Sequence, residues 1–458
     1  MGKPEEQRPW LKKSACVNPY CRAYSSSLPF NKTHNIMKKY FMSVAALAGM
    51  MSLAACSSDD IVSPADNDVQ TIKIAVASTG DKATRGRELN SEEPDQNIEN
   101  VTVVIRNKAT NAVVYHKTIT NWNSDDVSSI YTDNGHGREY TLKLEGAERL
   151  NKGEYTITAV GYTADDFKNN TIVDATTGEV AGNFTAEVAD GKAAQEAFAG
   201  ESSINLAVNH AAINTSVTLH RQVAGYYGYF TSIPVEINNK KVTDVRLVAR
   251  SKNTKLTYGN FNSNFTTTNS DIMYVVNGSE SVTTKDAKFN GSADNDAYTV
   301  YDIKVANWFT QGDTNNDGIL DEKDGGWTNA LATKGYKTYQ EGTIFAGGFA
   351  VPFAATDAAT LELQLLDENG EILKAWTVEM ATAQPAGQDV EKAALPVAET
   401  KQHFSFFRNH MYTLGKKMDN TTTPGTTPDE PEPLDKSQSI TLRVNDNWEV
   451  INRMTIGD

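Results

Sequence analysis

The 458-residue sequence is poor in cysteine, in long apolar runs and in positive charge. Its three cysteines exclude a disulfide-stapled scaffold, and no apolar run reaches the ~18 residues that a membrane-spanning helix needs. The 43 Lys and Arg against 58 Asp and Glu give a net charge of −15. This balance argues against a nucleic-acid partner, because phosphate binding needs a basic face. The remaining composition, 39% hydrophobic and 22% charged, is typical of a globular protein.

Catalytic motifs are also absent from the sequence. It contains no Gly-x-Ser-x-Gly elbow, no His-Glu-x-x-His pair and no phosphate-binding Gly-rich loop. Its seven histidines show no metal-ligand spacing, and His410 is interpreted as a hydrogen-bonding residue at a strand end rather than as a base. We therefore predict that the protein is not an enzyme, and a secreted hydrolase is disfavoured.

The segment from Met37 to Cys56 has the organisation of an export signal. Lys38 and Lys39 precede a short apolar stretch, and Leu-Ala-Ala comes directly before Cys56. This ending resembles the lipobox of bacterial lipoproteins, which implies a signal peptide over residues 37–55, attachment of a diacylglycerol to the Cys56 thiol, with palmitate as the lipid, and Cys56 as the mature N-terminus. The alternative, a buried apolar helix with an incidental cysteine, explains neither the lysines nor the polar residues 57–60. Residues 1–36 are interpreted as an upstream segment from a start codon placed too early.

Beyond Cys56 the pattern predicts an all-β protein. Apolar and polar residues alternate in the way expected of half-buried strands within 72–76, 101–105, 155–160, 217–219 and 361–365. Residues 107–111 and 367–370 are typical hairpin turns. Only 191–199 is predicted to be helical, because cap-type residues flank an Ala-rich stretch. Many short strands favour β-sandwiches, and the length suggests two in tandem, at 86–228 and 229–418, with the boundary near 225–232.

The two ends of the mature chain carry strands that lie apart from these domains. Residues 419–437 are rich in Thr, Pro and acidic residues and predict an extended linker without core-forming residues. Residues 438–458 follow it and contain a further alternating strand, whose apolar side chains are Ile440, Leu442, Val444, Trp448 and Val450. An isolated strand is not stable in water. It must pair either within its own domain or with the sheet of another molecule, and the residues alone leave both open.

At the other end, residues 69–78 alternate as a strand and lead into a polar, Gly-containing loop at 80–87. This loop displays Arg85 and Arg87, and exposed loops of this kind are cut by trypsin-like proteases. Cleavage there would detach residues 56–85, including the first strand, and would open a groove in the first domain. Of the two arginines, Arg85 follows an Ala-Thr pair.

These features resemble, in their order along the chain, the fimbrillin family of type V pili, the Bacteroidales-type fimbriae. The resemblance rests on the lipobox, on the loop Lys82-Ala-Thr-Arg85, on Leu219-His-Arg-Gln-Val-Ala224 and on Phe407-Arg-Asn-His-Met-Tyr412. The tail after a Pro-rich linker is most similar to that of the major subunit of the short-fimbria type.

The resemblance implies two transthyretin-like β-sandwich domains with a C-terminal donor-strand appendage. It also implies a lipidated precursor at the outer membrane, removal of the first strand by an Arg-specific protease, and filling of that groove by the tail of a neighbouring subunit. The expected function is that of a fimbrial subunit for adhesion, with partners that are other copies of itself, related subunits and host or bacterial surface receptors. The alternative is a monomeric surface lipoprotein that binds glycans, on which the aromatic run 226–230 could stack unless it packs in a core.

One acidic loop has the spacing of a calcium site. Oxygen-bearing side chains fall at positions 1, 3, 5, 9 and 12 of a loop with Gly at position 6 and a main-chain carbonyl at position 7. We predict structural Ca²⁺ at these positions: Asp313, Asn315, Asp317, Ile319, Asp321 and Asp324. Position 12 is Asp rather than Glu, and the flanking residues do not form a helix pair. The alternative is an acidic surface turn in an acidic chain.

Overall fold

The computed structural model describes residues 70–76, 98–122, 124, 126–127, 129–130, 138–163, 167–173, 180–188, 193–259, 275–281, 284–290, 296–328, 339–356, 359–380, 402–415, 430–436 and 440–445. The predicted signal peptide, Cys56, Arg85, Arg87, Trp448 and Val450 lie outside these ranges.

Regular structure in the described residues is almost entirely β, which confirms the all-β prediction. Besides strands, these ranges contain two short 3₁₀ turns, η2 (Gly146–Glu148) and η4 (Val305–Asn307), and no α-helix. Accordingly, the described part of the chain offers no helix of the length and apolarity needed to cross a bilayer.

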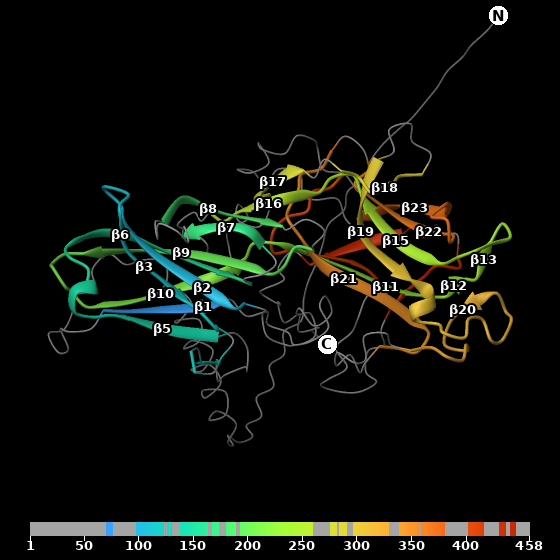
Figure 1. Cartoon of the computed structure of the whole chain (residues 1–458), viewed down its shortest axis with the longest axis horizontal. Helices are drawn as coiled ribbons and strands as arrows, with labels where there is room; N and C mark the ends of the chain where they lie inside the picture. The colour runs from blue at the N-terminus through green and yellow to red at the C-terminus, as the bar shows by residue number, and fades with distance from the viewer. Residues whose placement is uncertain are drawn as a thin grey trace, which may run out of the picture. The chain divides into compact units, whose positions relative to one another are not determined.

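The first sheet has eight strands, and the N-terminal strand lies inside it rather than at its edge. Figure 1 shows this strand in blue beside its neighbours. In spatial order the strands are β3 (Val113–Ile119), β2 (Asn100–Asn107), β6 (Gly153–Tyr162), β9 (Ala197–Leu206), β10 (Ile213–Arg221), β1 (Gln70–Val76), β5 (Arg138–Leu144) and β4 (Ser129–Ile130).

A core of aliphatic and aromatic side chains lies against this sheet. Ile72 and Ile74 of β1 are fully buried in it with Ile157 of β6 and Val217 of β10, whereas Lys73 is half exposed. Side chains alternate between the two faces of a strand, so β1 contributes one row of apolar residues to this core. The predicted alternation of residues 72–76 is therefore confirmed for Ile72, Lys73 and Ile74.

The second sheet has ten strands, and the C-terminal strand lies inside it. In spatial order they are β18 (Ala287–Lys288), β19 (Asp296–Lys304), β15 (Asp244–Ala249), β22 (Leu361–Leu366), β23 (Ile372–Met380), β26 (Ile440–Asn445), β24 (Met411–Leu414), β11 (Ala224–Thr231) and β21 (Thr343–Ala350), with β25 (Glu432–Pro433) paired to β11.

Smaller sheets complete the fold. One consists of β17 (Gly278–Ser281), β16 (Asn253–Thr257), β8 (Val180–Val188) and β7 (Phe167–Val173), and two ribbons pair β12 (Ile233–Pro234) with β20 (Ile319–Leu320) and β13 (Glu236–Ile237) with β14 (Lys240–Lys241). The second core is larger than the first and takes side chains from residue 104 to residue 440. Because β8 pairs with β16, residues from both predicted domains share one sheet.

The helix predicted at 191–199 is wrong. Ala194 forms an isolated bridge with Phe349, and Ala197 to Ala199 begin β9. Phe198 pairs with Gly161 and is fully buried, and a methyl group built at the following Gly200 would lie 1.9 Å from the main-chain oxygen of Thr218, so close packing between strands decides the structure here. Tertiary packing has here overridden a weak local preference.

Strand β22 differs from its prediction as a half-exposed strand. All six of its residues are buried, including Glu362 and Gln364. The polar face is covered by the segment at 288–290: Gln364 Nε2 donates to the carbonyl of Lys288, and Glu362 accepts from the amide of Asn290. The alternation persists in the sequence because these polar side chains find buried partners instead of water.

The segment predicted as a linker at 419–437 contains a core-forming residue. Glu432 and Pro433 pair with β11, and Leu434 is fully buried in the second core. The amide of Leu434 donates to the carbonyl of Thr231, which holds this part of the segment against the sheet. Composition alone missed it because one leucine in a run of Pro and acidic residues produces no periodicity.

The chain passes from the first sheet to the second at Gln222 and Val223, between β10 and β11. Two sequence motifs that are nearly 190 residues apart meet at this point. Arg408 donates to the side-chain oxygen of Gln222 and to the carbonyl of Gly259, and the amide of Asn409 donates to the carbonyl of Val223. Residues 219–224 and 407–412 therefore form one buried junction.

Candidate functional site

Strand β1 occupies a position with a hydrogen-bonded neighbour on each side. It runs parallel to β10, with Ile74 opposite Val217, and antiparallel to β5, with Ile74 opposite Tyr140. It is paired along its whole length with β10 and along almost all of it with β5. Removal of β1 would therefore open a two-sided groove, which we call the β1 slot: the edges of β10 and β5 together with the apolar floor beneath Ile72 and Ile74.

A buried glutamine fixes β1 at the start of this slot. Gln70 is fully buried, and its Nε2 donates to the main-chain oxygens of Leu150 at 3.2 Å and Ala211 at 2.8 Å. Its Oε1 accepts from the amide of Leu150 at 2.6 Å. A buried amide group with all these partners sets the register of the strand, because a shift along the slot would leave the partners unsatisfied.

The tail strand β26 lies in the chain's own second sheet. It runs parallel to β23, with Ile440 opposite Val378, and antiparallel to β24, with Val444 opposite Tyr412. Ile440 is fully buried there. Of the predicted donor residues, Ile440, Leu442 and Val444 thus share one strand. Within a single chain the structure adopts the first of the two pairings that the sequence left open.

Both slots pair their strand on two sides. Among the described residues, β26 pairs with Val378–Met380 of β23 and with 411–413 of β24. The β1 slot offers paired residues on both edges, from 213 to 219 and from 139 to 144. An empty β1 slot would leave both of these edges unpaired.

The predicted calcium loop is fully described and forms a compact acidic turn. Asp313 accepts from the amides of Asn316 and Gly318, at 2.7 and 2.9 Å. Asp324 is buried and accepts from the amides of Thr314 and Asp321. Gly318 has a φ of +85°, as expected for the sharp turn at position 6.

As folded, this loop does not hold its carboxylates around a common centre. Nowhere in the described residues do three or more His, Cys, Asp or Glu side chains gather in a way that could hold a metal ion. Instead, Lys323 Nζ lies 3.0 Å from Asp321 and 3.9 Å from Asp317. The hydrogen bond with Asp321 raises the pKa of Lys323, so the ammonium supplies the positive charge between these two carboxylates.

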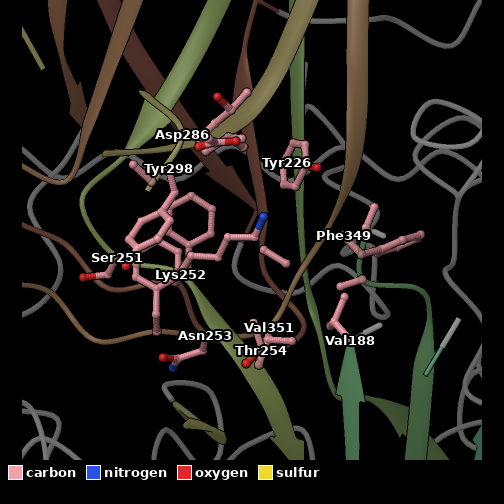
Figure 2. Close-up of a pocket in the computed structure, with 18 of the residues that line it drawn as sticks. Val188, Tyr226, Ser251, Lys252, Asn253, Thr254, Asp286, Tyr298, Phe349 and Val351 are labelled. Atoms are coloured by element: carbon pink, nitrogen blue, oxygen red, sulfur yellow. The ribbon is translucent and has the colours of Figure 1, made fainter. Parts of the chain in front are cut away.

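A pocket of about 570 Å³ lies beside β16, within the size range of small-ligand sites. Figure 2 shows Tyr298, Tyr226 and Phe349 on its walls, with Lys252 extending between them. Lys252 makes no hydrogen bond or ion pair with any residue in the described ranges. Burial raises the pKa of Tyr226 to about 12, so its hydroxyl stays neutral. The lining thus offers aromatic faces, the cation of Lys252 and the carboxylate of Asp286.

The aromatic run at 226–230 has mainly a packing role. Tyr227, Tyr229 and Phe230 are buried in the second core, and only Tyr226 reaches the pocket. His410 is fully buried, and its Nδ1 lies 2.8 Å from the main-chain oxygen of Arg408, beside the first residue of β24. Sequence reasoning did not single out Gln70 or Lys252: Gln70 is a polar residue within an alternating strand, and Lys252 belongs to no periodic pattern.

Comparisons with known proteins find no matching family model and no matching curated protein. Solved structures that are similar include a fimbrial assembly protein from Parabacteroides distasonis (14% identity, TM-score 0.35, covering 76% of this chain and 92% of that one). A candidate cell adhesion protein from the same organism has 12% identity and a TM-score of 0.37, over 83% and 97% of the two chains. Another, from Bacteroides eggerthii, has 13% identity and a TM-score of 0.35, over 84% and 97%. These identities and TM-scores are too low to support an argument about function. The function is therefore inferred from the arrangement of β1 and β26.

Proposed function

We propose that this protein is a structural subunit of surface fimbriae that assembles by strand exchange for adhesion. In this proposal the precursor is exported as a lipoprotein acylated at Cys56 and anchored to the outer membrane. An Arg-specific protease then cuts at Arg85 or Arg87 and releases β1. The tail of another copy, residues 438–458, enters the β1 slot through Ile440, Leu442, Val444, Trp448 and Val450.

The observation that carries the proposal is the position of β1 within the first sheet. β1 is hydrogen-bonded on both sides and is followed in the sequence by the Arg-containing segment 80–87. One cut in that segment separates β1 from its domain. An empty β1 slot exposes two strand edges and an apolar floor. Such a groove is unstable in water and is filled most simply by another strand, as in β-strand addition.

The driving force has the right size for a stable polymer. Burial of five apolar side chains contributes on the order of 10 kcal/mol before ordering costs, at ~1.5–3 kcal/mol per side chain. Against this stand the loss of the tail's pairing with β23 and β24 and of the burial of Ile440 in its own core. In this proposal exchange becomes favourable once β1 has left, because the empty slot exposes two unpaired edges and an apolar floor, and β1 itself blocks it before cleavage.

Strand exchange of this kind produces a filament rather than a closed oligomer. The donor tail and the acceptor slot are different surfaces of one subunit, so each added copy presents a new slot or a new tail. The proposed location follows: precursor at the outer membrane and mature subunit in a cell-surface fimbrium. The deciding experiment is whether loss of the tail ends polymerisation after Arg cleavage.

A second candidate function is favoured by the pocket beside β16. Aromatic walls suit a saccharide, because sugars stack on aromatic rings, and Lys252 and Asp286 offer polar groups to its hydroxyls. This would fit a monomeric surface lipoprotein that binds glycans. The two candidates separate after limited trypsin treatment: a fimbrial subunit polymerises, and a monomeric binder only becomes shorter.

We further propose that Ca²⁺ binds the loop 313–324 by replacing Lys323 as the partner of its carboxylates. Calorimetry on the full chain is expected to give heat at millimolar calcium, in the range of weak extracellular sites. Lys323→Ala should bind calcium more tightly, because the competing ammonium is gone, and Asp317→Ala more weakly. Absence of heat for the native chain and for Lys323→Ala would end this proposal.

A further inference from the structure

The tail repeats the residue pattern of the strand that it is proposed to replace. Residues 70–76 read Gln-Thr-Ile-Lys-Ile-Ala-Val, and residues 438–444 read Gln-Ser-Ile-Thr-Leu-Arg-Val. Alternation of apolar and polar residues explains the apolar side chains at the third, fifth and seventh positions of both segments. It does not explain why a glutamine and then a hydroxyl residue precede the first isoleucine in both segments.

Both strands also have the same kind of surroundings. β1 has a parallel neighbour, β10, on one side and an antiparallel neighbour, β5, on the other. β26 likewise lies between a parallel neighbour, β23, and an antiparallel one, β24. Ile72 and Ile440, which correspond in the two segments, are both fully buried. A segment that suits one slot therefore suits the other with the same chain direction.

The glutamine is the position with the most specific requirement. At the start of the β1 slot, the carbonyls of Leu150 and Ala211 and the amide of Leu150 converge on the side chain of Gln70. These main-chain groups stay with the acceptor when β1 is removed. A buried donor or acceptor left without a partner costs about 1–3 kcal/mol, so an incoming strand gains most if it brings an amide side chain to this point.

Charge on the face opposite the core agrees with the same register, with Lys73 half exposed and Ala75 buried on that face. Lys73 Nζ lies 3.2 Å from Glu139 of β5, and removal of β1 takes this cation away. In the alignment of the two segments Arg443 corresponds to Ala75, whose partner across the antiparallel pair is Glu139. An arginine there lies directly opposite the carboxylate, where opposite charges attract across strands.

We propose that the tail of a second copy enters the β1 slot parallel to β10 with Gln438 in the place of Gln70 and Ile440 in the place of Ile72. Gln438 is then the register-setting residue of the donor: its amide donates to the carbonyls of Leu150 and Ala211 and accepts from the amide of Leu150. Residues 437–439 lie outside the described residues of the single chain, so this assignment concerns the assembled state. It rests on the proposed strand exchange and specifies its register.

The test compares tail variants of the full chain after Arg cleavage. Gln438→Ala and Gln438→Glu should both form polymers that release subunits at least about tenfold faster on heating or in denaturant, since hydrogen bonds contribute about 0.5–1.5 kcal/mol each. The glutamate fails because it cannot donate to two carbonyls. Ser437→Ala, one residue outside the pattern, is the matched control and should release subunits at the native rate.

The outcomes separate the register from the exchange itself. If Gln438→Ala polymers are as durable as native ones while deletion of residues 438–458 abolishes polymerisation, exchange stands and the register is overturned. If the tail deletion leaves polymerisation unchanged, the proposed function fails instead. A companion variant in the acceptor, Gln70→Ala, should destabilise the uncleaved chain and leave polymer durability unchanged, because residue 70 has been removed from the polymer.

Discussion

Deletion of residues 438–458 is expected to abolish the polymers that form after Arg cleavage. The shortened subunit still exposes an empty β1 slot after cleavage but has no strand to donate. Native protein treated with limited trypsin should give a ladder of oligomers in detergent gels that collapses on heating, and the shortened protein should give a single band.

The control for this deletion must account for the place of the tail in its own sheet. Ile440 is buried in the second core, so its loss is expected to lower stability, and circular dichroism should show that the shortened chain remains folded. A synthetic peptide of residues 438–458 supplies an independent measurement on native protein: in excess it should cap empty slots and shorten the ladder. A ladder that neither the deletion nor the peptide changes would rule out the donor role.

Substitution of a β1 core residue is expected to affect the precursor and not the polymer. Ile74 is fully buried, so Ile74→Ala should lower the free energy of unfolding of the uncleaved chain by about 2–5 kcal/mol. In the mature polymer residue 74 is absent, so the dissociation temperature should equal that of native protein. Chemical denaturation of the precursor and heating of the polymer measure the two effects.

A buried residue that stays with the acceptor supplies the contrast. Ile157 of β6 lies in the same core and is equally buried. Ile157→Ala should destabilise both the precursor and the polymer, because the donor strand packs on the same floor. If Ile74→Ala weakens the polymer as strongly as Ile157→Ala does, then β1 has not left the assembled subunit.

The strands of the fold were predictable from the sequence where apolar and polar residues alternate, although the predicted exposed face is missing where residues 101–105 and 157–160 are buried on both faces. Residues 155–160 and 217–219 form strands as expected, and the turns at 107–111 and 367–370 connect paired strands. These predictions depend on local chemistry: Gly370 has a φ of +77° and Asn111 one of +56°, conformations that glycine and asparagine adopt readily.

Predictions failed where long-range packing decided the outcome. Residues 197–199 join β9 instead of a helix, because they pair with Val160, Gly161 and Tyr162 of β6 and their side chains are buried in the cores. Glu362 and Gln364 are buried although they alternate with leucines, since a distant segment supplies their hydrogen-bond partners. Neither effect leaves a signal within a few residues of the segment concerned.

The candidate site was predictable in its parts but not in its pairing. Alternation identified both terminal strands, and it could not choose a sheet for residues 440–445. The reason is physical: the site between β23 and β24 and the β1 slot both place a parallel strand on one side and an antiparallel strand on the other. In the proposed exchange the same segment pairs at either site, and the presence or absence of β1 decides which of them it occupies.

Disulfide trapping with one donor cysteine tests the central claim most directly. The three native cysteines all lie at or before residue 56, so a chain that begins after Cys56 has no other thiol. Arg443→Cys is opposite Thr413 when the tail is in its own sheet, and in the proposed register it is opposite Glu139 of another copy. Residues opposite each other in an antiparallel pair have Cα atoms about 4.5–5.5 Å apart, within reach of a disulfide.

The account predicts that the double variant Arg443→Cys, Glu139→Cys forms disulfides between chains after cleavage. A smaller fraction of the chains should become linked when the acceptor cysteine is placed at Thr141 or Lys143 instead. When oxidation follows cleavage, Arg443→Cys protein carrying Thr413→Cys should not form the internal link that uncleaved protein forms on oxidation. The account is contradicted if oxidation after cleavage still gives the internal link to residue 413 and captures no β5 cysteine of another copy.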